Sequence, residues 1–185
     1  MVRAGVEAYL EAEPGLTVAA AVSTVGEAEA FCEQLRPDVL VSDYHLPDGD
    51  GLSLCLRLEA AGGPPTVIFS AFADESLAVL AAVAGARAVV SKSADPDELI
   101  SAVEDVARGR RARLAATSSA LRTAGRRLDP HDLPVLGMVM HGLESDDIAR
   151  TLGLDVDGLY ERRMIMLECL RGRPRMAGSG AMRGP

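Results

Sequence analysis

Short apolar runs alternate with amphipathic segments along the first 107 residues of the chain. Four of these runs are apolar on both faces, which is typical of strands buried inside a parallel sheet. They lie at residues 16–22, 38–43, 65–71 and 86–92. We predict that each run forms a strand.

Amphipathic segments with helical spacing separate the predicted strands. They lie at residues 25–35, 51–62, 74–85 and 95–109. Thr24 with Glu27 predicts a capping box, and Asp95 followed by Pro96 predicts an N-cap with proline at the first helical position. Strands that alternate with helices over short connections imply right-handed crossovers and a doubly wound α/β sheet.

Three polar side chains follow the ends of three different predicted strands: Asp43, Ser70 and Lys92. In a doubly wound sheet the chemistry lies at the carboxyl ends of the strands, where loops and helix N-termini converge. Taken singly, each of these residues is more often a loop, cap or surface residue. We expect an acid, a hydroxyl and an amine to meet on one rim, and this convergence supports a functional site.

A second pattern begins at residue 128, where three short helical segments follow one another up to residue 172. Gly142 and Gly153 separate them, and this spacing is typical of a helix-turn-helix. Pro134 in the first segment and Gly158 in the third should weaken their helices by roughly 3 and 1 kcal/mol relative to alanine in a helix interior. The Gly-, Pro- and Arg-rich residues 172–185 predict a disordered tail.

The net charge of −8 conceals four blocks of opposite sign. Residues 1–107 carry 5 bases and 18 acids, whereas 108–127 carry 7 arginines and no acid. Residues 128–170 carry 3 bases and 9 acids, and the remaining residues add 4 arginines. This alternation predicts two acidic domains joined by a basic linker at 110–127, partly helical at its start, with a basic tail.

Two general features suggest a cytoplasmic protein without a membrane partner. No uncharged apolar stretch approaches the roughly 18–20 residues of a bilayer span, and acids stand where a signal peptide would be apolar. Cys32, Cys55 and Cys169 are widely spaced and form no CxxC pair, so we expect reduced, apolar side chains.

Three motifs resemble those of receiver domains: "DVLVSDYHLPDGDG" (38–51) the phosphoacceptor strand and loop, "FSA" (69–71) the fourth-strand switch, and "VSK" (90–92) the fifth-strand lysine. Over residues 1–171 the chain is similar to two-component response regulators of the NarL/FixJ type. The resemblance implies a flavodoxin-like receiver at 1–109 and a small all-α LuxR-type helix-turn-helix domain, here degenerate, at 128–171.

The resemblance also implies a function and the residues that perform it. Asp43 would accept a phosphoryl group from a sensor histidine kinase, Ser70 would hydrogen-bond the phosphoryl oxygens, and Lys92 would neutralise them. Phosphorylation would promote homodimerisation and DNA binding. We therefore expect a transcriptional regulator and not an enzyme.

The chain departs from receivers where these hold Mg²⁺, because it lacks the first strand and the acidic pair at its end. In the family's 2-1-3-4-5 sheet order this strand is an interior one, so its loss leaves backbone groups without partners. Either the start site is placed too late, or the segment and its metal chemistry have been lost. The remaining metal ligands are Asp43 and the backbone carbonyl of His45, so we expect poor Mg²⁺ binding.

The helix-turn-helix departs further. Asp155, Asp157 and Gly158 begin the third helix, and acids at 144–147 precede it, although DNA affinity depends on neutralising phosphates. Arg162 and Arg163 are the basic candidates for DNA contact in this helix, and they would suit a solvated face equally well. DNA binding by this module should be weak unless the linker and tail contribute.

Two other functions remain open at this stage. A pseudo-receiver adaptor would act by protein–protein contact without phosphate or DNA, and the acidic helix-turn-helix and the missing acidic pair favour it. A small metal-dependent hydrolase would need a second carboxylate. An aspartyl-nucleophile phosphatase would have an acid at position 45, where the chain has His45.

Overall fold

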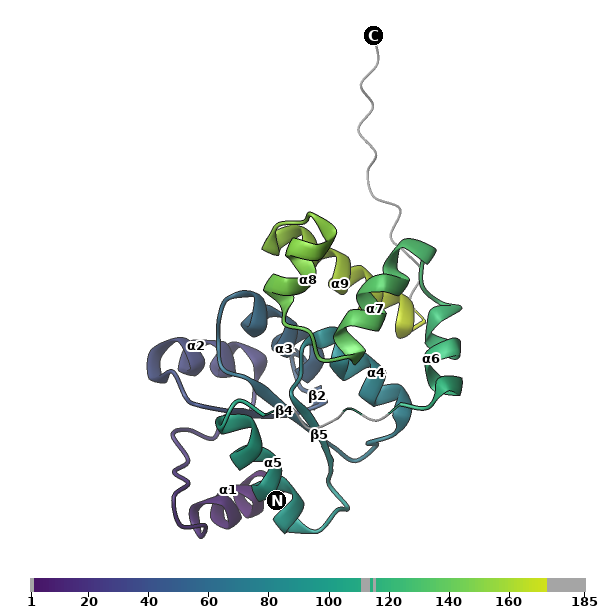
Figure 1. Ribbon diagram of the computed structural model, residues 1–185. Coiled ribbons are helices and arrows are strands. Elements are labelled where there is room, and N and C mark those ends of the chain that lie inside the picture. Colours follow the sequence, from purple (N-terminus) through teal and green to yellow (C-terminus); the bar gives the residue numbers. More distant parts are fainter. Residues whose placement is uncertain (1, 111–113, 115, 173–185) are drawn as a thin grey trace.

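The computed structural model describes residues 2–110, 114 and 116–172 of the 185. Its first half is an α/β layer structure and its second half a group of helices that lies against it (Figure 1). Most of the predicted tail, and residues 111–113 and 115 of the predicted linker, lie outside the described residues.

A three-stranded parallel sheet forms the centre of the first half, in the order β1-β4-β5. The strands are β1 (Leu40–Asp43), β4 (Thr66–Ser70) and β5 (Ala88–Ser91). Asp43 lies opposite Phe69, and Ser70 lies opposite Ser91, so the three strands end at nearly the same level. Three of the four predicted strands are therefore confirmed.

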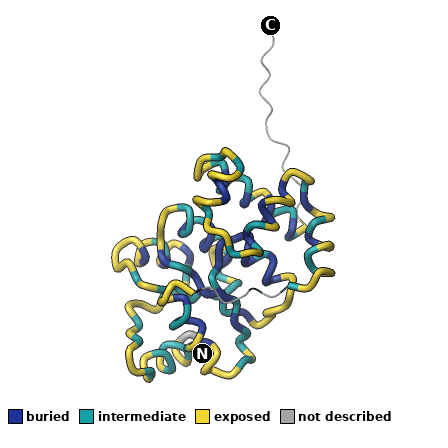
Figure 2. The backbone as a smooth tube through the Cα atoms, in the orientation of Figure 1, coloured by how far each residue is buried: buried dark blue, intermediate teal, exposed yellow. Residues whose placement is uncertain are grey.

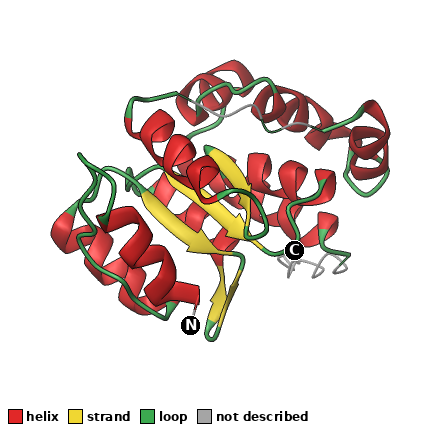
Figure 3. Cartoon of the chain, turned by 90° about the horizontal axis from the view of Figure 1, so that it is seen from below, coloured by secondary structure: helices red, strands yellow, loops and turns green. Residues whose placement is uncertain are grey.

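Helices cover both faces of this sheet (Figure 3). They are α1 (Val2–Glu11), α2 (Val25–Leu35), α3 (Gly51–Ala60), α4 (Glu75–Ala84) and α5 (Pro96–Ala107). The apolar sides of α1 and α5 share one core cluster with Val67 and Val90. The α2, α3 and α4 helices lie on the other face, where Ile68 and Leu40 point. The capping box at Thr24 and the cap at Asp95 are both present.

The predicted strand at 16–22 is wrong, because this segment has no regular secondary structure and belongs to no sheet. Its ends are anchored, since Leu16 and Val22 pack against different core clusters. A strand is defined by backbone hydrogen bonds to a neighbour, and among the described residues no strand lies beside this segment to provide them. The apolar pattern therefore predicted the burial of its ends but not its pairing.

The second half is entirely helical within the described residues. Its elements are α6 (Ser118–Gly125), the 3₁₀ turn η1 (Pro130–Asp132), α7 (Leu133–Met140), α8 (Ser145–Leu152) and α9 (Val156–Leu170). Gly142 and Gly153 adopt positive φ of 77° and 66° just after α7 and α8, a conformation that commonly ends helices.

One expectation for this half is corrected, and another is tested only in part. The described residues of the linker contain a helix in its second half, α6, because Thr117 caps a segment whose apolar side packs on the core. The helix expected at the start of the linker falls largely on residues 111–113 and 115, outside the described residues. Pro134 lies in the first turn of α7, where its missing N–H and fixed φ are tolerated, so the expected loss of helix stability does not apply.

The two halves share one hydrophobic core. Leu52 and Ile68 from the sheet half belong to the same buried cluster as Val135, Leu159 and Met166 from the helical half. The buried stretches gather where α3 and α4 meet α7 and α9 (Figure 2). The helical half is therefore packed against the first half and not merely tethered to it.

Two general expectations can be compared with the structure. Within the described residues, no helix combines the length and the apolar character that crossing a bilayer demands. All three cysteines are free, as expected. Burial raises the pKa of Cys55 to about 12, so this side chain is a neutral thiol in the core.

Candidate functional site

Asp43 and Lys92 meet at the carboxyl end of the sheet. Asp43 is the last residue of β1, and Lys92 directly follows β5, the strand on the far side of β4. The ammonium of Lys92 forms an ion pair with the Asp43 carboxylate. Both side chains are partly exposed, at 36% for Asp43 and 22% for Lys92, so the pair is accessible from solvent. Lys92 is also the single lysine of the chain.

Ser70 lies at the same edge, at the end of the central strand β4. Its side chain is buried, and its hydroxyl oxygen accepts a hydrogen bond of 3.2 Å from the N–H of Phe72. The backbone N–H of Lys92 donates to the Ser70 carbonyl at 2.8 Å, which fixes the two strand ends together. Ser70 is thus adjacent to the pair, but its hydroxyl is engaged with its own loop.

The loop after Asp43 folds into a hairpin that the sequence did not predict. Its strands are β2 (His45–Leu46) and β3 (Gly49–Asp50), and they place His45 opposite Asp50. The N–H of His45 donates a hydrogen bond to the Asp43 carboxylate at 3.3 Å. The hairpin thereby returns the chain to the strand end from which it left.

Gly51, the first residue of α3, packs directly on the backbone of Asp43. A Cβ atom at Gly51 would lie 2.2 Å from the Asp43 carbonyl oxygen and 2.7 Å from the Ser42 hydroxyl oxygen. The Ser42 hydroxyl also donates to that carbonyl at 3.1 Å. Glycine is therefore required here by the close approach of two backbone segments.

Gly51→Ala is expected to lower the free energy of unfolding by about 1–3 kcal/mol, because strand and helix must separate to admit the methyl group. Urea denaturation measures this change. Gly26→Ala is the matched control, since Gly26 is also helical and has no atom within 4 Å of its missing Cβ. Equal stabilities for the two variants would contradict the close packing at Gly51.

The acids of this region do not fit a magnesium ion. Within the part of the chain that the structure describes, no three His, Cys, Asp or Glu side chains are placed to hold a metal. Asp43 is paired with Lys92, Asp50 caps α3, and Asp48 accepts hydrogen bonds from the first turn of α2 that lower its pKa. Mg²⁺ needs an octahedral set of oxygen donors, which these residues do not offer together. The expectation of poor Mg²⁺ binding stays a prediction.

The two arginines expected to contact DNA are both engaged inside the protein. Arg162 donates to the carboxylate of Asp132 at 2.8 Å and to the carbonyl of His131. Arg163 is only 2% exposed and lies between α9 and the sheet half. Arg163 is thus unavailable to DNA in this arrangement, because the face of α9 that carries it is covered by α3 and α4.

Arg163 instead forms a buried cluster that sequence reasoning missed. Its guanidinium donates to Glu59 at 2.8 Å, to the Val83 carbonyl at 2.7 Å and to the Ser145 hydroxyl at 2.6 Å. Gly85, with φ of +84°, leaves room for this guanidinium, since a Cβ there would lie 2.6 Å from it. No local pattern marks these residues, because they lie on four separate segments of the chain.

Two further arginines join the halves. Arg87 forms a two-point ion pair with Glu144, with contacts of 2.6 and 2.8 Å. Arg171, which follows α9, binds Asp50 at the start of α3. Among the described residues, the helical half therefore contacts the sheet half by ion pairs at three places, one of them next to the loop that follows Asp43.

Comparisons with known proteins agree with this architecture. The family model of the response regulator receiver domain matches residues 1–104. The DNA-binding transcriptional activator DevR/DosR of Mycobacterium tuberculosis is 34% identical over 160 residues, covering 80% of this chain and 74% of that protein. The transcriptional regulatory protein UhpA of Salmonella typhimurium is 33% identical over 173 residues, covering 92% of this chain and 86% of that protein.

A solved structure of a response regulator is also similar to this chain. The crystal structure of a LuxR-family two-component response regulator from Aurantimonas sp. matches with a TM-score of 0.58 and 32% identity. The match covers 69% of this chain and 91% of that one. The range matched by the receiver family, 1–104, contains Asp43, Ser70 and Lys92. The match to UhpA covers 92% of this chain and therefore extends into the carboxy-terminal helices.

Proposed function

The chain belongs to the response regulator receiver family, and from this premise we propose that it is a two-component response regulator that controls transcription through phosphorylation of Asp43. The observation that carries the proposal is the pairing of Asp43 with Lys92 across two strands at the edge of the sheet. A carboxylate with a cation beside it, both partly open to solvent, supplies the nucleophile and one of the positive charges that phosphoryl transfer uses.

The chemistry assigns a role to each of the three residues. A carboxylate oxygen of Asp43 forms a bond to phosphorus while the bond between phosphorus and the donor breaks. Lys92 stays beside the new acyl phosphate and neutralises part of the charge on its oxygens. Ser70 can donate its hydroxyl proton to a phosphoryl oxygen while it still accepts the Phe72 N–H, because a hydroxyl has one donor and two acceptor sites.

The proposal is tested by incubating the full chain with acetyl phosphate and Mg²⁺ and measuring its intact mass. We expect one added phosphoryl group on the native chain and none on Asp43→Asn, which keeps the shape of the side chain but is a far weaker nucleophile. An identical mass shift in both proteins would place the modification elsewhere.

A phosphorylation-independent adaptor is the second candidate function. Two observations favour an adaptor: the described acids near Asp43 form no metal site, and Arg163 is buried against the sheet half. Such an adaptor would gain no phosphoryl group under the same conditions, and Asp43→Asn would leave its partner binding unchanged. The mass measurement therefore separates the two functions.

We propose that the chain binds DNA mainly through arginines at the end of α6, and less through those of α9. Arg122 on α6 and Arg126 at its C-cap are both exposed. Arg162 and Arg163 instead contact protein groups. Replacing Arg122 and Arg126 together with glutamine should reduce the magnitude of the slope of log K against log salt by about 1 to 2, because each phosphate contact contributes about 0.9 to that slope.

Fluorescence anisotropy with a random duplex of DNA measures this slope for the full chain. Arg150→Gln is the control, because Arg150 is also exposed but already pairs with Asp147 on its own helix. If the slope is unchanged in the Arg122 and Arg126 double variant but smaller in Arg162→Gln, the DNA contact lies on α9 instead.

The remaining partners follow from the family assignment. We propose a sensor histidine kinase as the phosphoryl donor, a homodimer as the active form and the cytoplasm as the location. We propose a regulatory and not an enzymatic function, in keeping with the similarity to the transcriptional regulators DevR/DosR and UhpA.

A further inference from the structure

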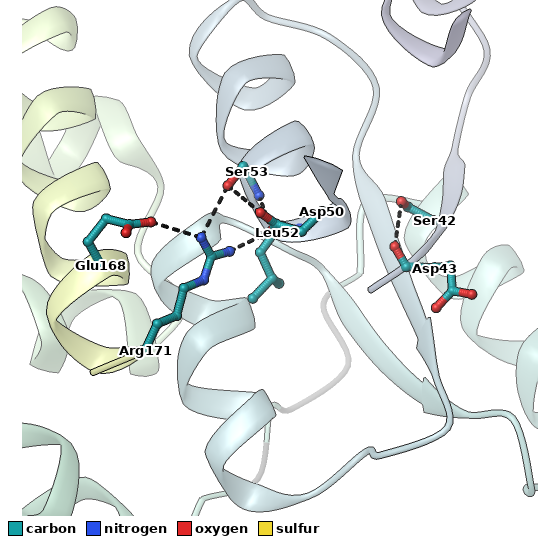
Figure 4. A network of polar contacts seen from close by, with 7 residues as sticks. All are labelled: Ser42, Asp43, Asp50, Leu52, Ser53, Glu168 and Arg171. Carbon is teal, nitrogen blue, oxygen red and sulfur yellow. Dashed lines mark hydrogen bonds and ion pairs between the residues drawn. The ribbon is translucent and has the colours of Figure 1, made fainter. Parts of the chain in front are cut away.

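One arginine connects the end of α9 to the loop that follows the phosphoacceptor. The Arg171 side chain is 10% exposed and forms an ion pair with Asp50. It also donates to the Ser53 hydroxyl at 3.3 Å and pairs with Glu168 at 3.1 Å. Figure 4 shows its guanidinium reaching from α9 to the start of α3, while the Asp43 carboxylate points away from it.

Asp50 is held from two sides. Its carboxylate accepts backbone N–H bonds from Leu52 at 3.0 Å and Ser53 at 2.9 Å, and the Ser53 hydroxyl at 2.8 Å. Burial alone would raise the pKa of Asp50, but the bonds from Ser53 and the charge of Arg171 lower it overall. A charged Asp50 therefore both caps α3 and binds the guanidinium.

The neighbours of Asp50 contact Asp43 directly. His45, its partner in the hairpin, donates its N–H to the Asp43 carboxylate, and Gly51 packs on the Asp43 carbonyl. A displacement of Asp50 therefore moves a hydrogen-bond donor on one side of Asp43 and a backbone contact on the other. The route from Arg171 to the carboxylate runs through the backbone of the hairpin.

We propose that Arg171 is a positioning residue for the phosphoacceptor, which fixes Asp50 and thereby holds His45 and Gly51 against Asp43. This inference rests on the proposed phosphorylation of Asp43 and deepens it, because it makes the end of α9 part of the receiver's site. Coupling between two sites is reciprocal, so a phosphoryl group on Asp43 alters the strength of the contact between Arg171 and Asp50.

The full chain with Arg171→Gln tests the proposal. We expect its phosphorylation by acetyl phosphate to be slower by about 10-fold to 100-fold, the size of effect that small misplacements of reacting groups produce. Arg171→Lys keeps the positive charge and should recover part of the rate. Arg127→Gln is the matched control, since Arg127 donates to the Leu170 carbonyl at the same helix end but belongs to a contact that does not include Asp50. Its rate should stay within about twofold of the native rate.

A second measurement does not depend on phosphorylation. Amide hydrogen exchange over residues 44–53 of the unmodified chain should be several-fold faster in Arg171→Gln than in the native chain or Arg127→Gln, because the hairpin opens more often. If the native chain gains no phosphoryl group, the proposed function is wrong. Faster exchange in Arg171→Gln would then still support the role of Arg171 in fixing residues 44–53. Unchanged exchange, or native phosphorylation rates in Arg171→Gln, would overturn the positioning role.

Discussion

Arg163→Met is expected to lower the free energy of unfolding by about 3 kcal/mol, near the lower end of the values found when one partner of a buried ion pair is removed. The methionine would fill much of the space, but Glu59 would keep its charge at 19% exposure without a cation beside it. The Val83 carbonyl would also lose its donor. The expected loss is therefore electrostatic more than steric.

Urea denaturation of the full chain measures this loss. Arg150→Met is the control, because Arg150 pairs with Asp147 in the same half of the protein but with both side chains more than half exposed. Its stability should change by about 0.5 kcal/mol or less. Adding Glu59→Gln to Arg163→Met should restore part of the stability, since it removes the unpaired charge. Equal changes for the two single variants would contradict a buried ion pair between the halves.

Lys92→Met is expected to slow phosphoryl transfer to Asp43 by about 10²–10³-fold, the effect of removing one preorganised charge from a developing anion. Lys92 is the cation that directly contacts the Asp43 carboxylate among the described residues. Because the pair is partly exposed, its loss should cost less than about 1 kcal/mol of stability. The rate and the stability therefore respond very differently to the same change.

The rate is measured by intact mass over time with acetyl phosphate as donor, and the stability by urea denaturation. Lys92→Arg is the control, because it keeps the positive charge and should retain more of the rate than Lys92→Met. A Lys92→Met chain that is phosphorylated at the native rate would show that Lys92 has no part in the transfer.

The pairing of Asp43 with Lys92 was predictable because parallel strands end at a common edge. Two strand-end positions, found from short apolar runs, are sufficient to place both residues there. The turn glycines Gly142 and Gly153 similarly located the helix ends, because a positive φ is a local requirement. Local rules of this kind operate over a few residues and can be read without the fold.

Contacts between distant segments were not predictable in the same way. Arg163 and Glu59 are 104 positions apart, and Arg171 and Asp50 are 121 apart. The sequence shows an arginine in a helix, but whether it faces solvent, DNA or another helix depends on tertiary packing. The prediction of a strand at 16–22 was wrong for the same reason, because a strand needs a neighbouring strand that its own residues do not specify.

Identification of the phosphorylated residue tests the central claim most directly. The native chain is incubated with acetyl phosphate and Mg²⁺, treated with borohydride to reduce any acyl phosphate to an alcohol, digested and sequenced by tandem mass spectrometry. We predict homoserine in place of Asp43 and unchanged aspartate at positions 48 and 50. Unmodified Asp43, or homoserine at another aspartate, would contradict the assignment of Asp43 as the phosphoacceptor.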